Sequence, residues 1–270
     1  MSGKLVVCPT PIGNLGDITK RVAEALAEAD VVASEDTRRT RILLDHLGIN
    51  TRPIALHDRN ERSAIAGLVE KISQGEKVAL VSDAGTPVVS DPGFLLIRAC
   101  VESGANVEVL PGPTAVTTAL VASGLPADSF TFVGFLPRKA GELERLFSGS
   151  ASTLVAFESP NRIAAAMKVL AEFEPGRKVA VCRELTKVHE EVIRGSAEEV
   201  AQELAKRQVK GEVTVVVGPP EAEEDVGATP EAIGAARDLV AAGAKPRAAA
   251  KVVAKLTGAR ANDLYAALGD

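Results

Sequence analysis

Apolar and polar positions alternate between two kinds of segment over the first 218 residues. Short runs rich in Val, Leu and Ile are typical of buried strands, and the longer stretches between them repeat apolar residues three and four apart, as helices packed on a sheet do. In the first half of the chain the predicted strands are Leu5–Cys8, Val31–Ala33, Ile54–Leu56, Val78–Val81 and Val107–Leu110. This alternation predicts a mostly parallel sheet with helices on both faces.

A turn-rich stretch at Gly124–Ala127 predicts a boundary, because the alternation begins again after it. The strands predicted beyond it are Phe130–Val133, Thr153–Phe157, Lys178–Cys182 and Val213–Val217. The fold class is therefore α/β, with two α/β domains at residues 1–123 and 124–218. Residues 219–228 are predicted to form an acidic linker that starts with proline, and residues 229–270 a small helical extension capped at Thr229.

The second helix of this extension is predicted to start at Lys245–Pro246, with Ala249, Val252, Val253 and Leu256 on its apolar side. Its basic residues lie four apart and so share one face. They are Arg247, Lys251 and Lys255. A solvated face and a phosphate-binding face explain this stripe about equally well.

Three loops rich in Pro and Gly follow predicted strands of the first domain, at residues 9–16, 83–93 and 111–115. Any one of them is best explained as a tight turn between a strand and a helix. Three loops at the same edge of a sheet instead predict a ligand cleft, because ligands of open α/β sheets bind beyond the carboxyl ends of strands. In the second loop, Ser90 or Asp91 is expected to cap the helix that follows.

Composition and short motifs narrow the choice of ligand. The net charge is −5, so RNA would have to bind a local basic patch. The three cysteines and three histidines are scattered and predict neither a disulfide framework nor a metal site.

No apolar run is long enough to span a bilayer and no secretion signal opens the chain, so we expect a cytoplasmic protein. Dinucleotide, P-loop and nucleophile-elbow motifs are absent, which leaves a cleft suited to a nucleoside-like cofactor held by backbone groups.

Seven ordered motifs over roughly residues 4–218 resemble the tetrapyrrole methylase superfamily, and within it the branch that methylates ribosomal RNA. They are LVVCPTPIGNLGDIT, ASEDTRRT, SDAGTPVVSDPG, LPGPTA, VGFLPRK, FESPNRI and CRELTK. Relatives that act on corrin rings usually carry Gly-Asp-Pro in the second loop. Here that place holds Ser82-Asp83-Ala84-Gly85, which favours the RNA branch.

The resemblance implies that S-adenosylmethionine binds in a cleft between the two α/β domains. It also implies that the methyl group goes to the ribose 2′-hydroxyl of a cytidine in the decoding centre of 16S rRNA, within the small ribosomal subunit, and that the protein is a homodimer. Carried over by position, the cofactor-binding residues are Ile12, Asp83, Thr86, Thr114, Ala115, Phe157, Leu185 and Glu212.

Methyl transfer from a sulfonium to a hydroxyl needs alignment, and a base or a cation near the oxygen would help. Asp36, Glu184 and Lys187 are the candidates, since each follows a predicted strand. The alternative for each is an ion pair that ties the two domains together. Further basic residues close to strand ends are candidates for phosphate contacts that position RNA without reading its sequence. They are Arg38, Arg39, Arg41, Arg138 and Lys139.

Two other functions stay open at this stage. One is a methylase of tetrapyrrole rings, which would have no need of a basic helical tail. The other is a ribosome-associated module that has kept the fold without catalysis.

Overall fold

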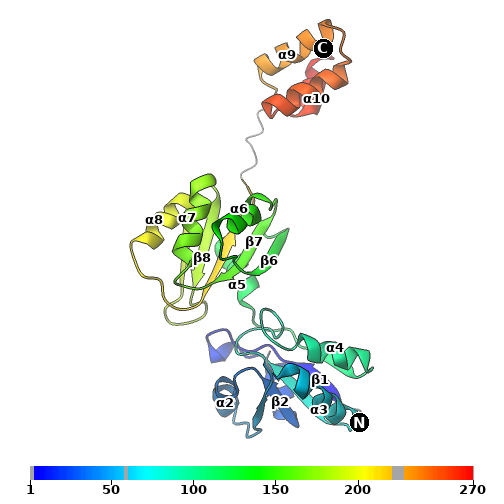
Figure 1. The fold of residues 1–270 in the computed structure, drawn as a ribbon, viewed down its shortest axis with the longest axis vertical. Coiled ribbons are helices and arrows are strands. Elements are labelled where there is room, and N and C mark those ends of the chain that lie inside the picture. Colours follow the sequence, from blue (N-terminus) through cyan, green and yellow to red (C-terminus); the bar gives the residue numbers. More distant parts are fainter. Residues whose placement is uncertain (1–2, 58–59, 221–227, 270) are drawn as a thin grey trace. The chain divides into compact units, whose positions relative to one another are not determined.

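The structure is a computed structural model that describes residues 3–57, 60–220 and 228–269. The chain divides into two compact units, Met1–Gly218 and Pro219–Asp270. The first unit contains two five-stranded sheets with their helices, and the second contains helices (Figure 1). Most of the predicted acidic linker, residues 221–227, lies outside the described residues.

The first sheet is parallel throughout, as predicted, with the strand order β3-β2-β4-β1-β5. Its strands are β1 (Lys4–Val7), β2 (Val31–Ser34), β3 (Pro53–Ala55), β4 (Lys77–Val81) and β5 (Asn106–Val109). The central strands β1 and β4 are almost completely buried, which explains their continuous apolar runs.

Helices cover both faces of this sheet, as predicted. Leu26 of α1 and Leu44 of α2 belong to the core on one face, whereas Leu68 of α3 and Leu96 of α4 belong to the core on the other. These helices are α1 (Lys20–Ala27), α2 (Thr37–His46), α3 (Glu61–Ser73) and α4 (Phe94–Glu102), and a short 3-10 turn at Leu15–Asp17 precedes α1.

The second sheet is mixed, with the order β6-β7-β10-β8-β9. Strands β6 and β7 are parallel, and the other neighbours are antiparallel. The strands are β6 (Phe130–Phe135), β7 (Thr153–Glu158), β8 (Lys178–Arg183), β9 (Glu191–Ser196) and β10 (Val213–Val217). Strand β9 was not predicted, because this edge strand reads EVIRGS and lacks the apolar run of a buried strand.

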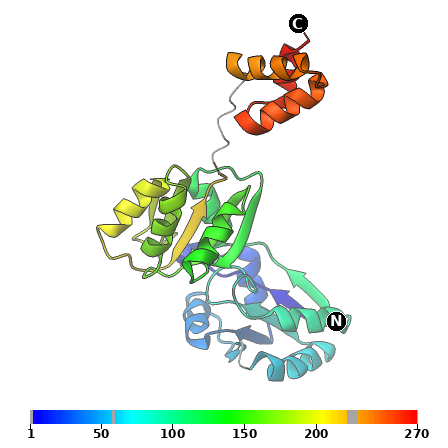
Figure 2. The same cartoon turned by 45° about the horizontal axis from the view of Figure 1, so that its top comes forward.

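Four helices cover the second sheet. Helix α5 (Ala115–Ser123) packs on one face through Ala119 and Leu120, and α6 (Ala140–Ser148), α7 (Ile163–Phe173) and α8 (Ala197–Ala205) pack on the other (Figures 1 and 2). The chain thus passes from the first sheet to the second in the segment just before α5.

Helix α4 begins differently from the prediction. Its N-cap is Gly93, with φ at 119°, and neither Ser90 nor Asp91 caps it. Instead, Glu61 at the start of α3 accepts hydrogen bonds from the backbone N–H groups of Gly93 and Leu95, both at 3.1 Å. A buried carboxylate from another helix therefore accepts the hydrogen bonds of the N–H groups at this helix end, and Asp91 does not act as the cap.

The C-terminal unit is a three-helix bundle of α9 (Pro230–Ala241), α10 (Pro246–Thr257) and α11 (Ala261–Ala267). Thr229 caps α9, as predicted, by accepting from the Ala232 N–H at 3.2 Å. The predicted apolar side of α10 was partly wrong, because Val252 and Leu256 are 51% and 80% exposed. The face that packs is made by Ala249, Ala250 and Val253, whose small side chains allow close contact between short helices.

Two further expectations concern the chain as a whole. Cys8, Cys100 and Cys182 are free and buried. Within the described ranges, no helix is long and apolar enough to cross a membrane.

Candidate nucleoside-binding site

The three Pro- and Gly-rich loops meet at one edge of the first sheet because they follow the adjacent strands β4, β1 and β5. Thr10 and Gly85 exchange two backbone hydrogen bonds, at 2.8 and 3.0 Å, which join the first loop to the second. The Thr86 hydroxyl donates to the Pro113 carbonyl at 3.2 Å and joins the second loop to the third. The loops therefore form one fixed surface.

Glycine is required at the centre of this surface. Gly85 has φ at 79°, in the left-handed region, and a Cβ atom there would lie 3.3 Å from Ile12 Cγ2 and 3.7 Å from the Pro113 carbonyl oxygen. A side chain at this position would strain the backbone and push the loops apart.

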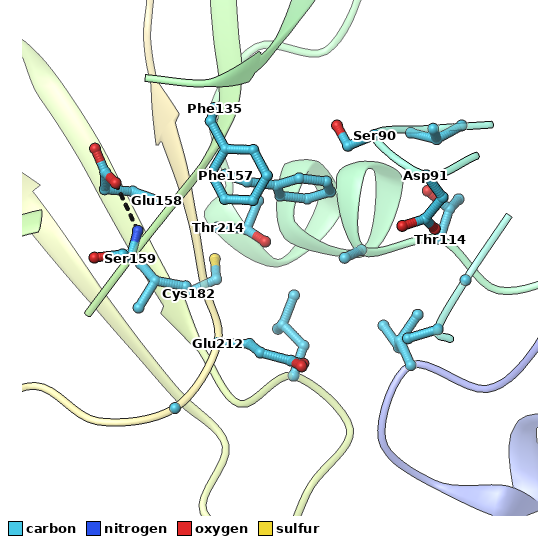
Figure 3. A pocket seen from close by; sticks show the side chains of 18 of the residues that line it. Ser90, Asp91, Thr114, Phe135, Phe157, Glu158, Ser159, Cys182, Glu212 and Thr214 are labelled. Carbon is cyan, nitrogen blue, oxygen red and sulfur yellow. Dashed lines mark hydrogen bonds between the residues drawn. The ribbon is translucent and has the colours of Figure 1, made fainter. Parts of the chain in front are cut away.

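A cavity of about 360 Å³ lies between this surface and the second sheet (Figure 3). That volume is within the range typical of small-molecule sites. Seven of the eight predicted cofactor-binding residues line it, namely Ile12, Thr86, Thr114, Ala115, Phe157, Leu185 and Glu212. In Figure 3, Thr114 and Asp91 lie on one side of the cavity and Glu212, Thr214 and Phe157 lie towards the other.

Asp83 is the predicted cofactor residue that does not line the cavity, although the adjacent Ala84 does. Its Oδ1 accepts from the Asp36 N–H at 2.9 Å, and its Oδ2 lies 3.7 Å from Arg39 Nε. Asp83 thus ties the loop after β4 to the loop after β2, and its role in cofactor binding stays a prediction.

Asp36 does not line the cavity either. Its side chain caps α2 by accepting from the Arg38 N–H at 2.9 Å, and it pairs with the Arg38 guanidinium at 2.8 Å. The hydrogen bonds from Arg38 lower the pKa of Asp36 to about 2. A carboxylate with such a low pKa is a weak base at neutral pH, so this geometry does not favour the predicted catalytic role.

Glu184 and Lys187 form a charged group with Glu212 beside the cavity. Lys187 Nζ lies 2.8 Å from Glu184 Oε1 and 2.9 Å from Glu212 Oε2. Burial acts to lower the pKa of Lys187, but hydrogen bonds to both carboxylates outweigh it and the pKa is raised. The hydrogen bond from Lys187 lowers the pKa of Glu184. The ion pair of Asp36 with Arg38 lies within the first domain, and those of Lys187 with Glu184 and Glu212 lie within the second. None of these ion pairs joins the two domains, which was the alternative role considered for these residues.

The loop that carries Lys187 touches the first domain. Glu184 and Thr186 have φ at 52° and 67°, values that non-glycine residues rarely adopt. A Cβ atom on Gly13 would lie 2.4 Å from Lys187 Cγ and 2.8 Å from Thr186 Oγ1. The first loop and this loop therefore approach so closely that only glycine fits between them.

The cavity also contains residues that the sequence analysis did not assign to a site. Phe135 and Phe157 pack edge to face, with ring centroids 5.8 Å apart, and provide an apolar wall. Glu158 Oε1 accepts from the Ser159 N–H at 2.6 Å (Figure 3). Glu158 Oε2 lies 2.8 Å from an Arg162 nitrogen, in an ion pair without hydrogen-bond geometry. The motifs VGFLPRK and FESPNRI carried the signal for this wall.

Other lining residues with a hydroxyl, thiol or carboxyl group were also not assigned to a site from the sequence. They are Ser90, Asp91, Cys182 and Thr214. Burial raises the pKa of Cys182 to about 11, so this thiol is protonated at neutral pH and is not a nucleophile. Burial also raises the pKa of Asp91 to about 6, and the charges of Glu35 and Asp83 add to this effect.

The side chains of the predicted RNA-binding residues differ in solvent exposure and in how many of their donors already bind other groups. The side chains of Arg38 and Lys139 are 89% and 82% exposed, and each pairs with a local carboxylate. Arg41 has its guanidinium bound to Asp45 and to the carbonyls of Ile49 and Thr51, so few of its donors face solvent. In the C-terminal unit Arg247, Lys251 and Lys255 are all exposed on α10.

Within the described residues, no group of three or more His, Cys, Asp or Glu side chains is arranged to hold a metal ion. The cavity has an apolar wall for a base, hydroxyl and backbone groups for a ribose or an amino acid, and carboxylates for an amine. This set of groups fits a nucleoside that carries an amino acid.

The two sheets and the interlocked loops define a two-domain α/β protein with a nucleoside-type cleft. The chain belongs to the tetrapyrrole (corrin/porphyrin) methylases, whose family model matches residues 4–201. A ribosomal RNA small subunit methyltransferase I of Mycobacterium tuberculosis (strain ATCC 25618 / H37Rv) is 47% identical over 99% of this chain and 95% of its own length.

A shorter relative with the same name, from Thermotoga maritima, is 41% identical over 80% of this chain and 98% of its own length. Among solved structures, uroporphyrin-III C-methyl transferase from Thermus thermophilus, complexed with S-adenosyl homocysteine, matches with a TM-score of 0.57 and 21% identity. It covers 80% of this chain and 97% of its own length, and at that identity it supports the fold only.

Proposed function

We propose that this protein transfers a methyl group from S-adenosylmethionine to the ribose 2′-hydroxyl of a cytidine in 16S rRNA of the small ribosomal subunit. The observation that carries the proposal is the cavity in which Thr86 and Thr114, from two loops of the first sheet, meet Phe157 from strand β7 of the second. The relatives named as small subunit rRNA methyltransferases support the choice of substrate.

The residues around the cavity suggest how the cofactor is held. Phe157, Ile12 and Leu185 offer apolar surface to the adenine, and Thr114 with the backbone N–H groups that open α5 offers donors to a carboxylate. Glu212 offers an acceptor to the amine. The cofactor supplies an electrophilic methyl group, and the rigid loops supply alignment.

RNA is expected to bind through phosphate contacts from exposed basic side chains around α2, after β6 and on α10. Arg38, Arg39, Arg138 and Lys139 are the candidates in the first unit. Arg247, Lys251 and Lys255 are the candidates in the second. A cytoplasmic location follows from a ribosomal substrate, and a homodimer is the oligomeric state that the family resemblance implies.

The test combines binding with substrate choice. Isothermal titration should detect S-adenosylmethionine binding, and labelled cofactor should transfer its methyl group to undermethylated small subunits, with 2′-O-methylcytidine identified by mass spectrometry. Transfer to a corrin precursor instead of the subunit would support a ring methylase. Cofactor binding without transfer to either substrate, or no binding, would support the non-catalytic module.

A further inference from the structure

Asp91 is a carboxylate in the candidate site that does not cap the helix it precedes. Glu61 caps α4 in its place, and the side chain of Asp91 lines the cavity next to Thr114 (Figure 3). Two other carboxylates line the same cavity, and both are paired: Glu158 with Arg162 at 2.8 Å, and Glu212 with Lys187 at 2.9 Å. Among the ion pairs of the described residues, none includes Asp91.

The backbone that presents Asp91 is strained. Val88 and Ser90 have φ at 76° and 66°, and the left-handed region is especially unfavourable for a β-branched residue such as Val88. Strain of this kind tends to persist at functional sites. A Cβ atom on Gly134 would lie 3.9 Å from Ser90 Oγ, an ordinary contact distance, so β6 packs next to this loop.

The surroundings of Asp91 keep its proton affinity high. Burial is the main cause of its raised pKa of about 6, and the negative charges of Glu35 after β2 and Asp83 after β4 raise it further. A hydrogen bond with Ser82 acts in the opposite direction. Arg39 lies beside Asp83 rather than beside Asp91. A carboxylate of this kind is ionised at pH 7.5 and is still a stronger base than an ordinary aspartate.

We propose that Asp91 is the general base that accepts the proton of the acceptor hydroxyl. In this step the O–H bond breaks and its proton goes to the Asp91 carboxylate, while the oxygen forms a bond to the methyl carbon. The carbon–sulfur bond breaks and its electron pair stays on sulfur, which becomes a neutral thioether. Asp91 then returns its proton to water. This inference rests on the proposed function, and it assigns the base to a residue other than Asp36 or Glu184.

The test compares the wild type with Asp91→Asn in single-turnover methylation of undermethylated subunits from pH 5 to 8.5. The wild-type rate should rise with pH and level off above an inflection near 6, whereas Asp91→Asn should be about 100-fold slower, within the range for loss of a general base, and should lose that inflection. Affinity for S-adenosylhomocysteine, measured by isothermal titration, should change less than about threefold because the base faces the acceptor.

A second readout does not depend on activity. Carbon-13 NMR of labelled aspartate carboxyls should show one resonance that titrates near pH 6 and is missing in Asp91→Asn. Glu35→Gln should move both this titration and the rate inflection to lower pH, because it removes a neighbouring negative charge. Glu102→Gln, at the far end of α4 in an exposed pair with Arg98, is the matched control and should change neither.

Three outcomes separate the possibilities. An Asp91→Asn protein that methylates subunits at the wild-type rate overturns the inference and leaves the proposed function intact. A variant that loses cofactor affinity as strongly as rate also overturns it and makes Asp91 a cofactor ligand. A wild-type protein that methylates no subunit contradicts the proposed function itself.

Discussion

Glu61 caps a helix whose N-cap residue lies 32 residues further along the chain: its Oε1 accepts from the Gly93 N–H at 3.1 Å. The same oxygen accepts from the Leu95 N–H at 3.1 Å and from the Leu96 N–H at 3.4 Å, so one buried carboxylate binds three N–H groups at the start of α4. Negative charge at this end also interacts favourably with the helix dipole. This pairing fixes α4 against α3 and defines the end of the loop that carries Asp91.

Replacement of Glu61 by Ala should lower the free energy of unfolding by about 1–3 kcal/mol, because buried N–H groups would lose their acceptor. Glu61→Gln keeps an oxygen acceptor and should cost less. Urea denaturation measures both effects. Glu70→Ala, an exposed position on the same helix, controls for helix propensity and should change stability by less than about 0.5 kcal/mol. Equal losses at positions 61 and 70 would show that the cap contributes little.

The sequence predicted what depends on local periodicity and missed what depends on distant partners. The strands β1 and β4 are continuous apolar runs because both faces are buried, and so their pattern was unambiguous. Asp91 satisfied the local rule for a helix cap, but Glu61 occupies that role from another helix. Likewise, the periodicity of α10 could not show that small alanines rather than Val252 face the neighbouring helices.

The same contrast between local pattern and distant partners applies to the residues of the candidate site. The loops that carry Thr86 and Thr114 were located because Pro and Gly mark the ends of parallel strands, which meet at one edge, whereas the two residues themselves were assigned from the family resemblance; both line the cavity. Phe135 was missed because its contribution depends on how the second sheet faces the first. That relation comes from packing across domains, for which one sequence carries no periodic signal.

Gly13→Ala should weaken binding of S-adenosylmethionine by about tenfold or more, because the added methyl group would force the first loop away from Lys187 and Thr186. The neighbouring Leu185 carbonyl, 2.9 Å from the added atom, is backbone and yields less easily than a side chain. Isothermal titration measures the affinity. Gly67→Ala is the matched control, since nothing lies within 4 Å of a Cβ atom there and alanine favours the helix. Wild-type affinity in Gly13→Ala would indicate that the two loops separate without affecting the site.

Charge reversal of Lys251 and Lys255 to Glu should weaken binding to the small subunit and leave S-adenosylmethionine affinity unchanged. Both lysines are exposed on α10, in the C-terminal unit, whereas all residues that line the cavity belong to the first unit. If each lysine binds a phosphate, the slope of log affinity against log salt should become shallower by about one for each lysine replaced.

Lys206→Glu provides the comparison for a change of charge elsewhere, since this lysine is exposed at the end of α8. Filter binding of each variant to the small subunit at several salt concentrations distinguishes a loss caused by the α10 lysines from a general effect of changed charge. Equal losses of subunit and cofactor affinity in the α10 variant would indicate misfolding, and an unchanged salt slope would remove α10 from the RNA interface.

Asp91→Asn should make the protein more stable at pH 7.5 and leave its stability unchanged at pH 4. The folded-state pKa of about 6 lies above the ordinary 3.8, so the folded state binds the proton more tightly than the unfolded state does. Stability is therefore lost as the pH rises from about 4 to 6, and the deficit persists above that window. Since Asp91 is only partly buried, we expect a gain of roughly 1–2 kcal/mol in the variant at pH 7.5.

Urea denaturation of the wild type and of the variant at pH 4 and pH 7.5 measures this gain. Because both proteins carry the same other titratable groups, the contribution of those groups cancels when the two free energies of unfolding are subtracted at each pH. Glu102→Gln should show no such pH-dependent gain. A variant less stable than the wild type at pH 7.5 would mean that the carboxylate is held by favourable contacts, and it would then be a poor candidate for a base.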